Sequence, residues 1–338
     1  MANLMLTKQC NLHCPYCFAN EFVNKDSELM SLAAFREALS FLSSSPNERI
    51  GLIGGEPTLH PQFQEMLAIL IDSPFRFVSI FTNGIMLEPF LNELRDRRFH
   101  ILINLNSPEK VGENKFNQII QQIDTMLNRL YMRRQVSIGI NIYKEDMDYG
   151  FILDTIDRFQ FKQVRVSVAV PNLDDKRNLN PLDYFQRMMP TVRGFVKDIV
   201  QLGAAPSFDC NYIPSCMITE EDRLFLRQHE AVTRNGNSLN SNHICSPVLD
   251  ILPNLDVIRC FAMSDYHKVK MHDFKNIGEI RRHFELEIDN LAYSFPPSHD
   301  CITCHEYLVG KCSCGCYAYR LKSMREFREM RQQYILSK

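Results

Sequence analysis

The chain has 338 residues, of which 45% are hydrophobic and 23% are charged, and its formal net charge is -2. This composition is typical of a folded globular protein, and the near-neutral total argues against a nucleic acid as the main partner. Met1 runs almost directly into an apolar strand rather than a signal peptide, and no apolar run approaches the ~18 residues of a membrane span. We therefore expect a cytoplasmic protein that binds neither nucleic acid nor membrane.

Short apolar runs alternate with amphipathic segments through the N-terminal half of the chain. Strands are predicted at residues 4–6, 49–53, 77–81, 100–105, 136–142 and 164–170. Helices are predicted at 31–42, 63–70, 89–95, 116–130 and 149–159. This alternation indicates an α/β fold with a parallel sheet covered by helices. Six strands are too few for a closed eight-stranded barrel, so we expect an open, partial (β/α)6 TIM-like barrel that binds ligands at the carboxyl ends of its strands.

The twelve cysteines are unevenly distributed along the chain. Three lie between residues 10 and 17, none between 18 and 209, and nine between 210 and 316. In a long chain without a secretion signal, metal ligation explains such clusters better than disulfides do.

Cys10, Cys14 and Cys17 share one short loop after the first predicted strand. Three thiolates on one loop can hold three corners of a four-iron cluster and leave the fourth iron open to a non-protein ligand, since four cysteines are the usual full set. A zinc knuckle is the alternative, although zinc sites favour two separate pairs of cysteines.

Gly54-Gly55-Glu56-Pro57 follows the second predicted strand. Two glycines let a backbone come close to a ligand and expose its amides and carbonyls, although such turns also occur without a ligand. Thr82-Asn83-Gly84 ends the third strand, where Asn-Gly is a common turn.

The three-cysteine loop and the Gly-Gly-Glu-Pro turn together resemble the radical S-adenosylmethionine (SAM) superfamily. The resemblance implies a [4Fe–4S] cluster on the loop, with the amine and carboxylate of SAM on its open iron. It also gives Glu56 the structural role of fixing the turn. Asn104 and Asn141, at the ends of the fourth and fifth strands, are candidates for the SAM ribose or are simple turn residues. The implied SAM contacts are Tyr16, Gly54, Gly55, Glu56, Pro57, Asn104 and Asn141.

The alternation stops after residue 171. Residues 172–181 are polar and indicate a linker or a loop over the barrel mouth, and 184–202 predicts an amphipathic helix. Cys210 and Cys216 are each most simply a small buried hydrophobe. The alternative places Asp209 or Cys210 at the barrel mouth, as a catalytic base or hydrogen-atom donor.

A second group of cysteines occupies the C-terminal part. Cys245 and Cys260 flank a predicted hairpin, with strands at 248–252 and 257–258 around a Pro253-Asn254 turn. Clustered thiols invite oxidation unless a metal holds them. The remaining thiols of this part are Cys301, Cys304, Cys312, Cys314 and Cys316.

This pattern resembles the SPASM extension of radical SAM enzymes, which usually holds two auxiliary [4Fe–4S] clusters. By that resemblance, Cys245, Cys260 and Cys316 serve one cluster. The second cluster would use Cys301, Cys304 and Cys312.

Two departures from the pattern leave alternatives open. Leu255 stands where the hairpin usually has glycine, and no cysteine follows Cys316 to provide the final ligand. Seven local thiols cannot fully ligate two clusters, which need eight. Cys314 could replace the missing ligand, one cluster could keep an open iron, or a single cluster could accompany a structural zinc.

We expect four segments: a barrel core at 1–172, a helical region packed on it at 173–242, a SPASM-like domain at 243–320 and a basic helix at 321–338. The resemblance implies an oxidoreductase that cleaves SAM to a 5′-deoxyadenosyl radical and takes hydrogen from a peptide or protein, giving an oxidative modification or crosslink. It also implies a flavodoxin- or ferredoxin-type electron donor. The alternatives are a dehydrogenase or oxidase of a small molecule and a non-catalytic iron–sulfur electron carrier, which would need no SAM pocket.

Overall fold

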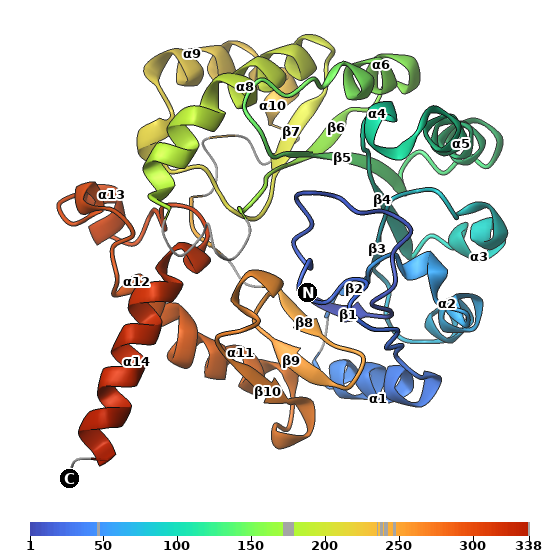
Figure 1. The fold of residues 1–338 in the computed structure, drawn as a ribbon. Helices are drawn as coiled ribbons and strands as arrows, with labels where there is room; N and C mark the ends of the chain where they lie inside the picture. The colour runs from blue at the N-terminus through green and yellow to red at the C-terminus, as the bar shows by residue number, and fades with distance from the viewer. Residues whose placement is uncertain are drawn as a thin grey trace.

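One curved sheet runs through the part of the chain that the structure describes, in the order β10-β9-β8-β1-β2-β3-β4-β5-β6-β7. The structure is a computed structural model and describes residues 1–45, 48–171, 179–234, 236, 239, 243–245 and 248–336. Strands β1 to β7 are parallel and pair in chain order. Figure 1 looks into the curved sheet, with its helices on the outside. The predicted partial barrel is confirmed.

Short apolar strands and amphipathic helices build this barrel. The parallel strands are β1 (Ala2–Met5), β2 (Ile50–Ile53), β3 (Val78–Thr82), β4 (Phe99–Asn104), β5 (Val136–Ile142), β6 (Gln163–Val168) and β7 (Ala205–Phe208). The helices among them are α1 (Leu32–Ser43), α2 (Phe63–Ile71), α3 (Leu91–Leu94), α4 (Pro108–Val111), α5 (Glu113–Asp124), α6 (Gly150–Phe159) and α8 (Pro181–Gln201).

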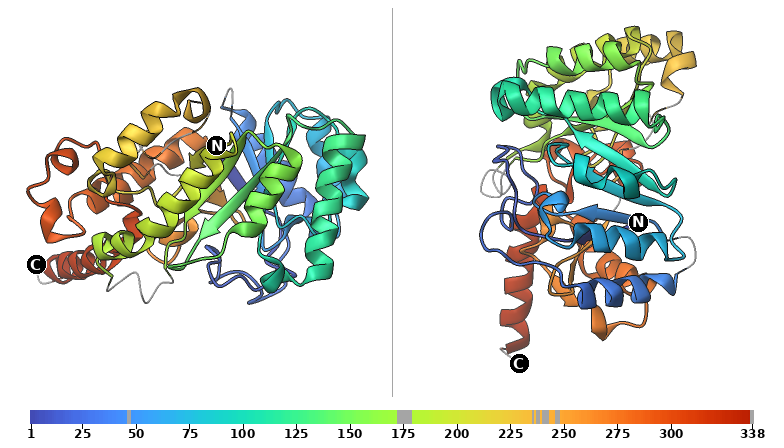
Figure 2. Two further views of the ribbon diagram at one scale, coloured as in Figure 1. Left: turned by 90° about the horizontal axis from the view of Figure 1, so that it is seen from above. Right: turned by 90° about the vertical axis from the view of Figure 1, so that its right-hand side faces the viewer.

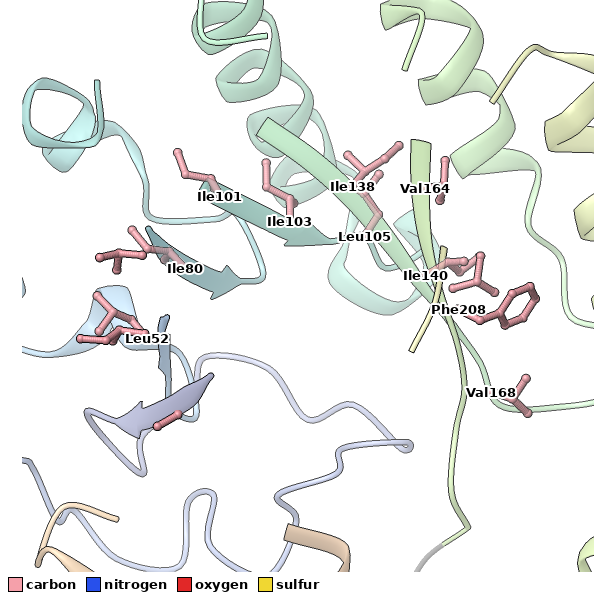
Figure 3. Close-up of a cluster of buried hydrophobic side chains, with 14 of the residues drawn as sticks. Leu52, Ile80, Ile101, Ile103, Leu105, Ile138, Ile140, Val164, Val168 and Phe208 are labelled. Carbon is pink, nitrogen blue, oxygen red and sulfur yellow. The ribbon is translucent and has the colours of Figure 1, made fainter. Parts of the chain in front are cut away.

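Alternation along each strand separates two layers of side chains. In β4, Phe99, Ile101 and Ile103 are fully buried while the residues between them are partly open. Figure 3 shows the corresponding apolar side chains of successive strands, from Leu52 to Phe208, forming one layer. The opposite face points into the barrel and is more polar, so apolar burial on the helix side holds the sheet together and leaves the inner face for ligands.

A seventh parallel strand, β7, was missed by the sequence analysis, which expected six. Its four residues include Pro206 and Ser207, and so they do not form a recognisable apolar run. The strand ends immediately before Asp209 and places the residues that follow at the carboxyl edge of the sheet.

A C-terminal hairpin continues the sheet on the other side of β1. The strands of the hairpin are β8 (Leu249–Ile251) and β9 (Asp256–Ile258). A further strand that was not predicted, β10 (Lys268–Lys270), pairs with β9 at the edge of the sheet. Strand β8 pairs with β1 in parallel and with β9 in antiparallel register. Leu255, at the usual glycine position, has a left-handed φ of 62°. Its side chain is buried, so apolar packing offsets the ~1 kcal/mol or more that such a conformation costs.

The first two of the remaining helices lie beside α8 and β7, and the last four lie beside the C-terminal hairpin and toward the open side of the barrel (Figures 1 and 2). They are α9 (Glu220–Gln228), α10 (Glu230–Thr233), α11 (Ile277–Phe284), α12 (Asn290–Tyr293), α13 (His305–Leu308) and α14 (Leu321–Leu336). The predicted linker at 172–181 falls mostly on residues 172–178, outside the described part. None of the helices described is long and apolar enough to cross a membrane.

A buried carboxyl group joins β1 to the hairpin. Asn3 Nδ2 donates to Asp250 Oδ1 at 2.8 Å, and Asp250 is only 3% exposed. Burial raises the pKa of Asp250 to about 8, against the opposing hydrogen bond from Asn3.

We predict that Asp250→Asn makes the stability of the protein less dependent on pH. An unfolded Asp ionises near pH ~3.9, so between there and about pH 8 the native state holds a proton that the unfolded chain has lost. The stability from this group is fully present below the unfolded pKa and falls as pH rises through the folded pKa. The variant should gain at least ~1 kcal/mol relative to the native protein between pH 5 and pH 8. Anaerobic thermal unfolding of both proteins measures this, and parallel pH curves would contradict it.

Candidate functional site

The three-cysteine loop leaves the carboxyl end of β1 and passes across the barrel, as the dark blue chain in Figure 1 shows. Burial raises the pKa of all three thiols, that of Cys10 to about 11. The thiols also lie close enough for their charges to act on one another: Cys14 acts on Cys10, Cys17 on Cys14 and Cys10 on Cys17, and each effect raises the pKa further. The backbone N–H of Leu12 donates to Cys10 Sγ at 3.4 Å.

Asn24 holds the start of this loop and was not identified from the sequence. Its Oδ1 accepts from the Cys10 N–H at 2.8 Å, and its Nδ2 donates to the Cys10 carbonyl at 3.2 Å. Its φ of 57° is left-handed, a conformation that asparagine tolerates better than most residues. Asn24 thus orients Cys10 from fourteen residues away.

The Gly54-Gly55 turn packs directly on the same loop. The N–H of Gly55 donates to the Thr7 carbonyl and that of Glu56 to the Gln9 carbonyl, both at 2.7 Å. A Cβ on Gly55 would lie 2.2 Å from the Gln9 carbonyl oxygen. Glycine is therefore required here by the backbone of the cysteine loop.

Glu56 ties this turn to the end of β3. Its Oε1 accepts from the hydroxyls of Thr58 and Thr82 at 2.7 Å, and its Oε2 accepts from the Asn83 N–H at 2.7 Å. The side chain is 1% exposed, and burial raises its pKa against these opposing hydrogen bonds. The structure thus places Glu56 inside the scaffold, away from any position for a proton donor to substrate.

A cavity of about 410 Å³ opens beside Tyr16 and the ends of β4 and β5. The Tyr16 hydroxyl donates to Asn106 Oδ1, and Cys14 Sγ lies 3.7 Å from the same oxygen. Asn141 also lines this cavity. Asn106 was missed because it lies two residues beyond the strand end at which the sequence analysis placed the ribose contact.

Asn104 and Asn141 meet at an arginine that the sequence analysis did not identify. Arg165 Nη1 donates to their Oδ1 atoms at 3.1 and 3.2 Å, and its Nε donates to Asp209 Oδ2 at 2.7 Å. Gly139 leaves room for this side chain, since a Cβ there would lie 2.9 Å from Arg165 Cδ. The two amide oxygens thus already have a partner, and the Asp209 carboxylate is held by an ion pair.

The C-terminal thiols separate into two groups. The hairpin group comprises Cys245, Cys260 and Cys316. The buried Arg259 places its Nη1 3.5 Å from Cys245 Sγ and 3.6 Å from Cys260 Sγ, and the Cys316 thiol hydrogen-bonds to that of Cys245. The C-terminal group comprises Cys301, Cys304 and Cys312. Cys314 is buried beside this second group and donates its N–H to Cys312 Sγ at 3.3 Å.

Cys210 and Cys216 lie beside these groups, contrary to the simpler interpretation that each is a buried apolar residue. By surface area both are exposed, yet burial raises the pKa of both thiols. No signal in the local sequence around either residue indicated this placement.

The arrangement of the cysteine thiols suits iron–sulfur clusters better than single metal ions. Among the described residues, no three His, Cys, Asp or Glu side chains converge closely enough to hold one metal ion. Zinc, with Zn–S bonds of ~2.3 Å, draws its ligands nearly into contact, whereas a cluster spreads its ligands over the corners of a larger core. Backbone N–H groups also donate to Cys10 and Cys316 from two residues further on. Thiolate ligation with N–H hydrogen bonds to sulfur is characteristic of iron–sulfur sites.

We predict that Gly55→Ala displaces the cysteine loop and removes most of the iron that this loop binds. The reason is the 2.2 Å approach of the added Cβ to the Gln9 carbonyl oxygen. The effect is measured as the iron content of Gly55→Ala after anaerobic reconstitution, compared with the iron content of the control variant Gly278→Ala. In the control, the nearest atom to the new Cβ is a side-chain oxygen at 3.1 Å. Native iron content and native SAM binding in Gly55→Ala would contradict the prediction.

Comparison with known proteins agrees with this geometry. Residues 4–146 match the profile of the Radical SAM superfamily. The chain is 26% identical to GTP 3′,8-cyclase of Vibrio atlanticus (strain LGP32), over 42% of this chain and 45% of that protein. It is 29% identical to 7,8-dihydro-6-hydroxymethylpterin dimethyltransferase of Methanocaldococcus jannaschii, over 83% of this chain and 60% of that protein. The chain thus spans about half the length of the curated relatives it matches.

Solved structures share the fold over 95% of the chain, including its cysteine-rich C-terminal part. Streptococcus suis SuiB bound to S-adenosylmethionine has a TM-score of 0.61 at 16% identity, over 73% of that chain. Native anSMEcpe with bound AdoMet and Cp18Cys peptide has a TM-score of 0.65 at 17% identity, over 90% of that chain. The chain therefore carries, at residues 4–146, a domain of the radical SAM superfamily, whose members use a [4Fe–4S] cluster and SAM.

Proposed function

We propose that this protein cleaves SAM reductively and oxidises or crosslinks a peptide or protein substrate. The observation that carries the proposal is the convergence of three features at one edge of the barrel: the three neighbouring thiols, the Gly-Gly turn packed on their loop, and the cavity beside Tyr16. Bound there, the cluster and SAM would supply one electron and a 5′-deoxyadenosyl radical that takes a hydrogen atom from the substrate.

The residues around the cavity would bind and orient SAM. Cys10, Cys14 and Cys17 would hold the cluster, and the Gly54–Pro57 turn would present backbone groups to the amino group of SAM. Tyr16 and Asn106 are joined by a hydrogen bond at the cavity wall and would meet the nucleoside end. Asn141 lines the same cavity and would lie near the ribose.

The Arg165–Asp209 pair is the best candidate for the substrate-facing chemistry. Asp209 Oδ2 is held by Arg165, while Asp209 Oδ1 is buried and has no hydrogen-bond partner among the residues that the structure describes. A carboxylate oxygen left without a donor can accept a proton once the substrate has lost a hydrogen atom. Arg165 would hold this carboxylate in its orientation. The electron that leaves with the proton would pass to an auxiliary cluster at the hairpin group.

The peptide substrate is supported by the fold, since SuiB is also known bound to its precursor peptide SuiA. The second candidate is a SAM-dependent dehydrogenase or oxidase of a small molecule. Its small-molecule substrate, though not the type of reaction, is supported by the longer sequence match to the pterin dimethyltransferase, which covers 83% of this chain. In either case a flavodoxin- or ferredoxin-type protein would deliver the electron. The hairpin and C-terminal groups would form the SPASM-like part, although its hairpin shares one sheet with the barrel.

We predict that anaerobic incubation of the reconstituted protein with SAM and dithionite releases 5′-deoxyadenosine. Cys14→Ala should abolish release, because two thiolates cannot replace the three that hold the cluster. The triple variant with alanine at positions 10, 14 and 17 should also be inactive but should retain iron at the auxiliary groups. Chromatography of the nucleoside and iron analysis measure these outcomes. If the native protein carries its full iron but neither binds nor cleaves SAM, the proposed function is contradicted. The protein would then be a non-catalytic iron–sulfur electron carrier.

We predict that Asn106→Ala weakens SAM binding by roughly tenfold. The substitution removes the Asn106 acceptor of the partly buried Tyr16 hydroxyl at the cavity wall, and a lost hydrogen bond of this kind costs ~1 kcal/mol or more. Equilibrium dialysis of SAM against the reconstituted protein measures the dissociation constant. Asn128→Ala is the matched control, since the Asn128 side chain donates to Asp124, one helical turn away, on an exposed surface. Equal affinities of the two variants would remove Asn106 from the proposed site.

A further inference from the structure

An arginine is buried beside the thiols of the hairpin group. Arg259 lies between the end of β9 and Cys260, and it is only 1% exposed. A guanidinium has five N–H donors and remains positively charged in proteins. Such a charge is almost never fully buried unless it is paired. The partners of Arg259 therefore decide what a charge at this position can do.

Two elements of the C-terminal part hold the guanidinium in place. Its Nε donates to Asp289 Oδ1. Its Cζ lies 4.9 Å from the centroid of the Tyr317 ring, a distance at which a cation and an aromatic ring attract each other. Asp289 ends the helical turn before α12, and Tyr317 directly follows Cys316. The side chain is thus fixed from two directions.

The other two nitrogens of Arg259 differ in their partners. Nη1 lies 3.5 Å from Cys245 Sγ and 3.6 Å from Cys260 Sγ. Nη2 is buried and has no hydrogen-bond partner among the residues that the structure describes. A buried donor without an acceptor is costly and needs an explanation. An iron–sulfur cluster on these thiols would supply one, because its sulfur atoms accept hydrogen bonds.

Another buried arginine of the C-terminal part shows the contrast. Arg320 is 2% exposed, and each of its three nitrogens donates to a backbone carbonyl. The acceptors are Phe295 for Nε, Cys316 for Nη1 and Ser313 for Nη2. These bonds fix the loop that carries Cys316, so protein contacts account for Arg320. They do not account for Nη2 of Arg259.

We propose that Arg259 raises the reduction potential of the cluster at the hairpin group. It would donate hydrogen bonds to sulfur from Nη1 and Nη2 and place a positive charge against the cluster. The inference rests on the proposed function, which places an auxiliary cluster at this group. Net charge and hydrogen bonds to sulfur are among the factors that set such potentials. Both effects stabilise the reduced state, which carries one more negative charge.

This role fits the oxidation that we propose for the protein. A substrate that has given a hydrogen atom to the 5′-deoxyadenosyl radical must still lose one electron and one proton to complete a two-electron oxidation. Asp209 is the proposed acceptor of the proton. The electron would be received at the hairpin group, where Arg259 offsets the added negative charge. Arg259 would thus make the hairpin group a better electron acceptor.

Asp289 should oppose Arg259 in this arrangement. Its carboxylate neutralises part of the guanidinium charge, and an asparagine in its place would keep an oxygen that can accept from Nε. Asp289→Asn should therefore raise the potential further, whereas Arg259→Gln should lower it. A purely structural role of the ion pair gives no reason for shifts of opposite sign.

Redox titration of the full reconstituted chain, followed by electron paramagnetic resonance, tests the proposal. The auxiliary transitions are those that persist in the variant with alanine at positions 10, 14 and 17. Arg259→Gln should shift one of them negative by at least ~59 mV, which is a tenfold change in the equilibrium constant for one electron. Asp289→Asn should shift the same transition positive. Arg259→Lys keeps the charge but lacks the planar fork, so its transition should lie between those of Arg259→Gln and the native chain.

Arg281→Gln is the matched control. Arg281 also forms an ion pair in the C-terminal part, with both carboxylate oxygens of Glu48. Its side chain is 37% exposed, so solvent screens its charge. Loss of this charge should leave every auxiliary transition at its native potential.

A double variant keeps the test independent of how well the single variant folds. Arg259→Gln leaves Asp289 unpaired where its side chain is only 16% exposed, whereas Arg259→Gln with Asp289→Asn removes both charges together. The transition of the double variant should be more negative than that of Asp289→Asn alone. Equal potentials in these two variants, or a positive shift in Arg259→Gln, would overturn the proposal.

The outcomes also separate this inference from the proposed function. Unshifted transitions in a chain that releases 5′-deoxyadenosine would overturn the role of Arg259 and leave the function standing. The expected shifts in a chain that does not release 5′-deoxyadenosine would do the reverse. A variant with alanine at positions 10, 14 and 17 that holds no iron would overturn the inference, because no auxiliary cluster would exist.

Discussion

The close contact between the Gly54-Gly55 turn and the cysteine loop is the constraint on which the site depends. Two backbone hydrogen bonds of 2.7 Å join the segments, and there is no space between them for a side chain. The buried Glu56 then links this pair to the end of β3. Three strand ends thus share one rigid backbone unit, and the thiols project from it. A loop that lacked this support would have to order its cysteines at the expense of conformational entropy.

Arg165 plays the corresponding part on the opposite strands. One guanidinium contacts the ends of β4 and β5 and the residue after β7. Its planar fork can satisfy several oxygens at once, which a lysine could not do. The inner polar face of the barrel is therefore connected by hydrogen bonds from the proposed SAM cavity to the carboxylate beside Cys210.

The features that could be predicted from sequence are those encoded locally. The spacing of Cys10, Cys14 and Cys17 and the Gly-Gly-Glu-Pro turn each lie within a few residues, and the strand–helix alternation is visible as periodicity. Strand β7 escaped because four residues containing a proline do not form a pattern. Arg165, Asn106 and Asn24 escaped because their partners are far along the chain. The position of Asn211, and with it the neighbouring Cys210, likewise follows from a contact with Cys316, 105 residues further along the chain.

The place of β1 in the sheet has a consequence for biosynthesis. This strand is central in the folded protein, between β2 and β8, yet it is made first and its second neighbour spans residues 249–251. On the ribosome, β1 therefore presents an unpaired edge until residues 249–251 have emerged. Exposed edges recruit other strands, and non-local pairing forms slowly. The β1 edge is thus open to non-native pairing during this interval, and the hairpin that brings Cys260 is also the element that closes it.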